Sequence, residues 1–63
     1  MSEIIRLQID LTDNEAWDYA QFLKRVGYSE YKNNAADSEE AYRMVRVGEK
    51  IRKALAEQGV SPR

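Results

Sequence analysis

The side chains that could do chemistry in this 63-residue sequence are carboxylates, amines, guanidinium groups and phenols, because histidine and cysteine are absent. The usual general base and the usual nucleophile near neutral pH are therefore both missing. Asp37, Glu39 and Glu40 form a dense group of carboxylates, but a helix is expected to begin there, and capping explains them better than acid–base work. The sequence thus predicts a protein that is not an enzyme and that binds no cofactor or metal.

Basic residues form a second pattern on the last expected helix. Because they are spaced 3, 4 and 3 residues apart, they share one face, which could bind a phosphate backbone or an acidic protein surface. An ordinary solvated face is the favoured alternative, since glutamates precede two of them by four residues, the favourable order for ion pairs. The four residues are Arg43, Arg46, Lys50 and Lys53.

Aromatic residues give the sharper indication of a binding surface. Trp17 and Phe22 flank the apolar face of the first expected helix, and Tyr28 and Tyr31 lie in the linker after it. Tryptophan and tyrosine are enriched among the residues that anchor protein interfaces. The alternative is that so small a protein uses its aromatics to close its core. With the four basic residues, these aromatics are the predicted partner-binding residues.

Length and charge limit the functional classes. Ten basic and eleven acidic residues give a net charge of −1, which disfavours both a nonspecific nucleic-acid binder and an acidic nucleic-acid mimic. A chain this short buries only about 60 % of its unfolded surface, so association with another chain is one available source of stability. No apolar run approaches the roughly 20 residues of a membrane span. We expect a soluble, cytoplasmic protein that does not bind membranes.

The N-terminal residues alternate in polarity. In residues 4–11, apolar Ile5, Leu7, Ile9 and Leu11 alternate with Arg6, Gln8 and Asp10, the period of a strand with one buried face. The rest of the chain has helical periodicity, so the predicted fold is a mostly α, α+β mini-domain. It consists of a strand at 4–11, a helix at 12–26, a linker at 27–37 with a possible short helical turn, a helix at 38–58 and a tail at 59–63.

Local signals define the ends of the two expected helices. Residues 12–15, TDNE, form a capping box, and Gly27 is expected to end the first helix. Gly59 and Val60 suit a Schellman motif at the end of the second helix. The apolar seam of that helix is predicted to contain Ala41, Met44, Gly48, Ile51 and Leu55.

The predicted strand has no second strand to pair with in its own chain. An exposed strand edge tends to recruit another strand, so we expect a symmetric homodimer through this segment. Addition to a sheet of a target protein and a simply hydrated edge are the alternatives. The outer face of the dimer strand would carry Ile4, Arg6, Gln8 and Asp10.

The stretch IRLQIDLTDNEAWDYAQFLKRVGYS resembles in rhythm the strand, first helix and glycine turn of ribbon–helix–helix DNA-binding proteins. In that family two chains pair their strands in the major groove, and by this resemblance Arg6, Gln8 and Asp10 would read bases. The family's second helix follows the turn directly, whereas a linker intervenes here. Asp10 would also face phosphates, and the N-terminus has no basic tail.

A resemblance over nearly the whole chain is carried by LTDNEAWDYAQFLKRVGYSEY, EAYRM and GEKIRKALAEQGVSPR. These segments look like a group of small bacterial proteins from plasmids, prophages and integrative elements. The resemblance implies a noncatalytic protein-binding module, an inhibitor or adaptor acting on host machinery, of the anti-CRISPR or another anti-defence kind. The alternative is a dimeric, ribbon–helix–helix-like DNA-binding transcriptional regulator.

Overall fold

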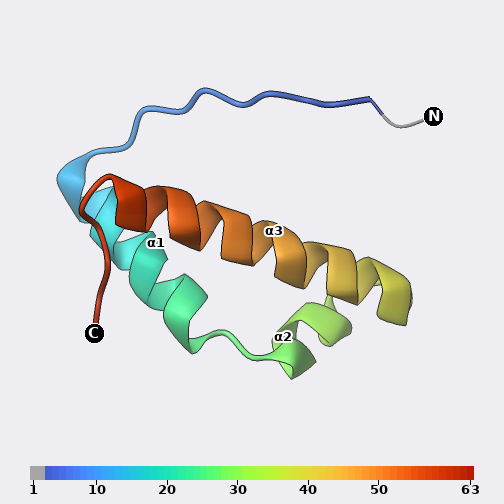
Figure 1. Ribbon diagram of the computed structural model, residues 1–63. Coiled ribbons are helices and arrows are strands. Elements are labelled where there is room, and N and C mark those ends of the chain that lie inside the picture. The colour runs from blue at the N-terminus through green and yellow to red at the C-terminus, as the bar shows by residue number, and fades with distance from the viewer. Residues whose placement is uncertain (1–2) are drawn as a thin grey trace.

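The computed structural model describes residues 3–63 as an extended N-terminal segment followed by three helices (Figure 1). Helix α1 spans Asp13–Arg25, α2 spans Tyr28–Asn33 and α3 spans Ser38–Glu57. Both α1 and α2 pack against α3, the longest of the three. The described part of the chain is helical and contains no strand, so the predicted α+β class is wrong.

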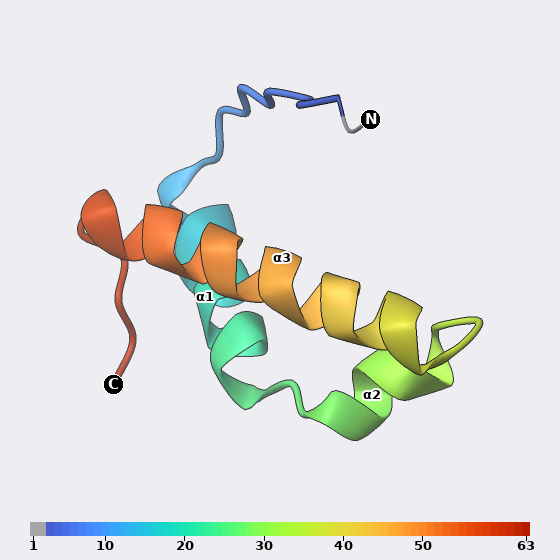
Figure 2. The same ribbon diagram turned by 45° about the vertical axis from the view of Figure 1, so that its right-hand side comes forward.

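Residues 3–11, here called the arm, have an extended backbone that pairs with no other segment of residues 3–63. The arm runs alongside α3, in the same direction, on the side away from α2 (Figures 1 and 2). The expected strand at 4–11 is therefore absent, and the helices do not cover its apolar face. Alternating polarity specifies an extended segment with two different faces, but a strand also needs a neighbour to hydrogen-bond to.

Helix α1 begins as the sequence predicts. The Thr12 hydroxyl accepts a hydrogen bond from the Glu15 backbone N–H at 3.2 Å, and the Glu15 carboxylate accepts one from the Thr12 N–H at 2.8 Å, which completes the capping box. The helix ends at Arg25, and the N–H of the capping residue Val26 donates to the Phe22 carbonyl. Gly27 directly follows the Val26 cap, as predicted, but its φ of −102° is not left-handed, and it serves as the N-cap of α2.

Helix α2 lies within the predicted linker, where the sequence indicated a possible helical turn. The Glu30 carboxylate accepts hydrogen bonds from the Gly27 N–H at 3.0 Å and from the Ser29 hydroxyl at 3.1 Å. The backbone N–H of Glu30 itself, followed by the bonds from Ser29 and Gly27, lowers the pKa of Glu30 below its ordinary value of 4.5, because these donors favour the charged form. Glu30 thus fixes the start of a six-residue helix that propensity alone would not sustain.

Helix α3 has the ends that the sequence predicts. The Asp37 carboxylate accepts from the Glu40 N–H at 2.8 Å and caps the N-terminus. At the other end Gly59 has a φ of +89°, and the Val60 N–H donates to the Leu55 carbonyl at 2.9 Å. These features confirm the Schellman motif, and Val60 packs against the core.

The core lies between α1 and α3 and is small. No large side chain in it is fully enclosed. Of the predicted α3 seam, Ala41, Gly48 and Leu55 are buried, whereas Met44 is half-buried and Ile51 remains 36 % exposed. The buried apolar side chains are Ala16, Ala20, Leu23, Ala41 and Leu55. Three of these five are alanines, so the helical layer gains little from burial.

Candidate functional site

A tyrosine pair joins α2 to α3 on the surface. The rings of Tyr28 and Tyr42 lie 5.2 Å apart between centroids, at an interplanar angle of 33°. Such a tilted pair contributes roughly 0.5–1.5 kcal/mol beyond its buried area. Tyr28 is nevertheless 41 % exposed and Tyr42 55 %, so the pair does not bury either ring.

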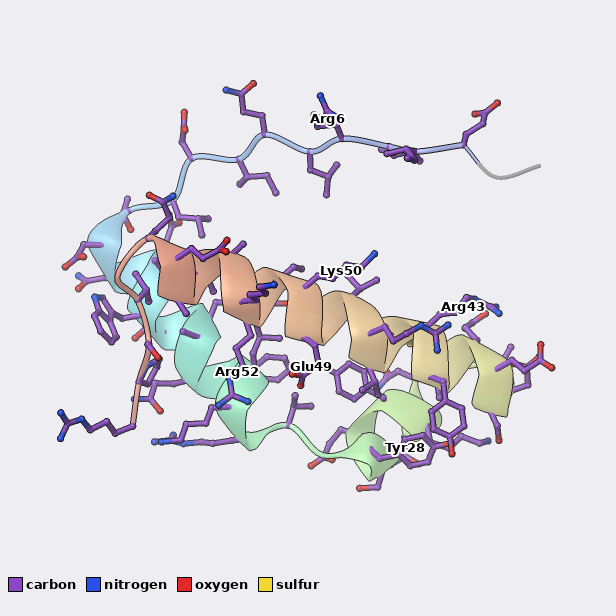
Figure 3. The ribbon with its side chains drawn as sticks, viewed as in Figure 1. Arg6, Tyr28, Arg43, Glu49, Lys50 and Arg52 are labelled. Carbon is purple, nitrogen blue, oxygen red and sulfur yellow. The ribbon has the colours of Figure 1, made fainter. Side chains whose placement is uncertain are left out.

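The four basic residues of the predicted stripe are all exposed on α3. Figure 3 shows Arg43 at the same end of the molecule as Tyr28, and Lys50 on the side of α3 that carries the arm. Arg46 lies four residues after Tyr42, so these two side chains are neighbours on the helix surface. The structure therefore places Arg46 one turn from Tyr42 and Arg43 at the same end of the molecule (Figure 3), whereas Lys50 and Lys53 lie farther along α3. We call Tyr28, Tyr42, Arg43 and Arg46 the α2–α3 surface.

Tyr31, another predicted partner-binding residue, packs inward. It is half-buried, and a Cβ atom placed on Gly48 would overlap its hydroxyl oxygen. Burial, followed by the proximity of Tyr19 and Glu49, raises the pKa of the Tyr31 phenol above 10.0. Tyr31 therefore fills the space that Gly48 leaves between α2 and α3, and its main contact is with the protein itself.

The two aromatics predicted from α1 lie away from the α2–α3 surface. Phe22 is 52 % exposed and stacks on Tyr19 at a centroid distance of 5.5 Å. Trp17 is 38 % exposed on the same helix. The partner-binding residues predicted from the sequence thus form no single patch, because they come from different faces of the helices.

The predicted dimer residues Ile4, Arg6, Gln8 and Asp10 are all exposed on the arm. In Figure 3 the Arg6 side chain points away from the helices. Side chains alternate along an extended backbone, so Gln8 and Asp10 share the outward face with Arg6. The odd-numbered apolar residues of the arm belong to the inward face, toward the helical layer.

Two open hollows lie on the surface of the described chain. One, of about 230 Å³, is bordered by the second half of α3 and the C-terminal tail, and the other, of about 510 Å³, lies between α1 and α2. Small-molecule sites are usually enclosed and mostly apolar. Within residues 3–63 no three acidic side chains gather as a metal site would require, and no helix has the length and apolarity to cross a membrane.

Comparison with known proteins gives one match. The whole chain, residues 1–63, matches a family of unknown function, DUF7706. The chain belongs to this family. No curated protein and no solved structure matches it. The match covers both the arm and the three helices, and membership in DUF7706 carries no activity over to any residue.

Sequence reasoning missed two residues of this DUF7706 chain that the structure makes prominent. Tyr42 follows the buried Ala41 and reaches Tyr28 only because α2 folds back on α3. Val47, 51 % exposed, extends an apolar stripe along α3 beside Ile51. The spacing of Met44, Val47 and Ile51, 3 and then 4 residues, is the signal that could have revealed this stripe.

Proposed function

We propose that this DUF7706 protein is a noncatalytic protein-binding module that uses its α2–α3 surface to bind a target protein. The observation that carries the proposal is the tilted but exposed pair of Tyr28 and Tyr42, with Arg46 one turn from Tyr42 and Arg43 at the same end of the molecule (Figure 3). Tyrosine and arginine are the residue types that dominate binding energy at protein interfaces. The open hollows and the absence of histidine and cysteine from the sequence support binding over catalysis.

The target that best suits this surface is an acidic protein. Guanidinium groups at the same end of the molecule as two exposed phenol rings favour carboxylates, which arginine binds in a bidentate manner, together with an apolar side chain that covers the rings. The resemblance to proteins of mobile elements supports a host protein as the target. We therefore place the protein in the cytoplasm as an inhibitor or adaptor of host machinery, of the anti-CRISPR or another anti-defence kind.

The test is an affinity pull-down from host lysate after nuclease treatment, with the wild type, the Tyr28→Ala/Tyr42→Ala double variant and Phe22→Ala. Phe22→Ala is the matched control because Phe22 is about as exposed as Tyr42 but lies on α1. We expect a protein that binds the wild type and Phe22→Ala and is lost with the double variant. Equal capture by all three proteins would contradict the α2–α3 surface.

DNA binding is the second candidate, and the extended arm directly before α1 is the observation that favours it. A pair of such arms could present Arg6 and Gln8 to a groove, as in ribbon–helix–helix proteins. The helix α2 between α1 and α3 and the net charge of −1 weigh against this function. Sequence-selective binding in a mobility-shift titration at physiological salt, abolished by Arg6→Ala, would establish it in place of the first candidate.

A further inference from the structure

The arm is the most exposed apolar segment of the described chain. Ile5 is 82 % exposed, Leu7 72 %, Ile9 67 % and Leu11 48 %. These side chains share one face of an extended backbone whose N–H and C=O groups pair with no other part of residues 3–63. A continuous apolar face of this kind on a soluble domain marks an interaction site.

The helical layer offers a complementary apolar surface. On α3, Val47 is 51 % exposed and Ile51 36 %, and the half-buried Met44 continues their stripe toward the start of the helix. Lys50 lies on the arm side of α3 in Figure 3, where its methylene stem can cover apolar atoms while the ammonium group stays in water. Within a single chain the arm does not bury this surface, because the apolar side chains of the arm and of α3 both remain exposed.

The total surface area indicates how much of the molecule needs a partner. The accessible surface of the chain is 5699 Å². A folded monomer of 7.3 kDa exposes roughly 4,200 Å². The excess of roughly 1,500 Å² falls within the about 1,000–2,500 Å² per subunit that an obligate homodimer buries.

We propose that the occupant of the arm's free edge is the arm of a second copy, aligned antiparallel so that each Arg6 lies opposite Asp10 of the other chain. Residues directly opposite each other in an antiparallel pair point to the same face, so the two apolar faces coincide only when odd residues oppose odd residues. Three central registers satisfy this condition. They place Arg6 opposite Arg6, opposite Gln8 or opposite Asp10.

Charge complementarity selects among the three registers. The first places like charges directly opposite each other, which is destabilising, and the second leaves Asp10 opposite the apolar Ile4. The third forms two Arg6–Asp10 pairs, with Gln8 opposite Gln8 at the two-fold axis. It also places Leu7 opposite Ile9, and all odd residues then form one apolar face over both helical layers. The backbone groups of each arm gain the hydrogen bonds that its own chain does not supply.

This inference goes beyond the proposed function, because the arm and the α2–α3 surface share no residue. Variants of the arm and of the tyrosine pair therefore fail or succeed independently. If the arm variants left the oligomeric state unchanged while the tyrosine variant lost its target, the dimer would be refuted and the α2–α3 surface supported. If the arm variants weakened dimerisation while the tyrosine variant still bound its target, the dimer would be supported and the α2–α3 surface refuted.

The experiment is light scattering behind a sizing column for the wild type and the arm variants R6D and D10R, alone and mixed. In either single variant both cross-chain pairs become repulsive, so we expect the dimer dissociation constant to rise about tenfold to a hundredfold. Mixing R6D with D10R restores opposite charges at both pairs and should recover a heterodimer. The double variant R6D/D10R should recover a homodimer for the same reason.

The matched control is E3K, which changes the net charge as much as D10R does but lies outside the paired stretch; we expect it to dimerise like the wild type. Circular dichroism shows that each variant keeps its helices. A wild type that stays monomeric over a roughly hundredfold range of concentration would overturn the proposal. Single variants that dimerise like E3K, or a mixture that does not associate, would overturn the register and with it the proposal.

Discussion

The arm and the helical layer of this small protein illustrate two ways in which a chain satisfies its backbone. In α1, α2 and α3 most backbone hydrogen bonds close within each helix, and capping side chains such as Thr12 and Asp37 accept from free N–H groups at the helix starts. The arm has no such local solution, because an extended segment can satisfy its backbone only with water or with another chain. The helices therefore make their backbone hydrogen bonds within one molecule, whereas the arm needs water or another chain for its own.

The same contrast holds for apolar side chains. The large side chains Leu23 and Leu55 are buried between α1 and α3, whereas Leu7 and Ile9 of the arm are exposed in a single chain. A stability measurement on the isolated chain should thus be sensitive to the helical layer and insensitive to the arm. Substitutions in the two regions test this distinction.

The largest effect is expected for Leu55→Ala compared with Leu7→Ala. Leu55 is only 8 % exposed, so its truncation should lower the free energy of unfolding by about 2–5 kcal/mol. Leu7→Ala should change the unfolding of the dilute chain by less than about 0.5 kcal/mol, because Leu7 is exposed there. Chemical denaturation followed by circular dichroism at low protein concentration measures both. Equal losses in the two variants would show that the arm packs on its own helices.

A smaller effect is expected at the contact between α2 and α3. Gly48→Ala places a methyl group against the Tyr31 hydroxyl and should destabilise the protein by about 1–3 kcal/mol from overpacking, less the roughly 1 kcal/mol gained from helix propensity. Tyr31→Phe removes the overlapping oxygen. The double variant should therefore be more stable than Gly48→Ala alone in the same denaturation experiment. Strictly additive effects would mean that Tyr31 does not occupy this space.

The smallest effect concerns pH and the start of α2. The folded-state pKa of Glu30 is below its unfolded value near 4.5, so Glu30 contributes stability above that pH and loses it as the pH falls through the folded value. Glu30→Gln should remove this part of the acid dependence. Ser29→Ala deletes one of the hydrogen bonds and should give an intermediate result. Thermal unfolding from about pH 7 to about pH 3 measures the difference. The same acid dependence in all three proteins would contradict the role of Glu30.

The sequence predicted the helices well because their signals are local. Thr12 with Glu15, Asp37 with Glu40, and Gly59 with Val60 each act within one turn, so residue types at fixed spacing were sufficient. The strand was predicted from an equally regular pattern, and the prediction failed because pairing depends on a distant or separate segment. Gly27 follows the end of α1 as predicted, but its second role as the N-cap of α2 was not predicted, because short helices give weak periodic signals.

The candidate site was less predictable than the fold. Tyr28, Arg43 and Arg46 could be identified by type and spacing, but Tyr42 becomes part of the surface only through the packing of α2 on α3. Tyr31 has the same chemistry as Tyr28 and points to Gly48 instead. Residue type suggests an interface anchor, but tertiary contacts decide whether the side chain lies on the surface or packs against its own protein.

The proposed dimer gives the arm's backbone amides hydrogen-bond partners in a second copy, whereas the helix amides have theirs within each chain. Amide hydrogen exchange, measured residue by residue at protein concentrations well above and well below the dimer dissociation constant, tests it most directly. We predict alternating protection along residues 4–11 at high concentration and loss of that protection on dilution, with measurable protection of α1 and α3 in both samples. Arm amides that exchange equally fast at both concentrations, or that stay protected on dilution, would contradict the claim.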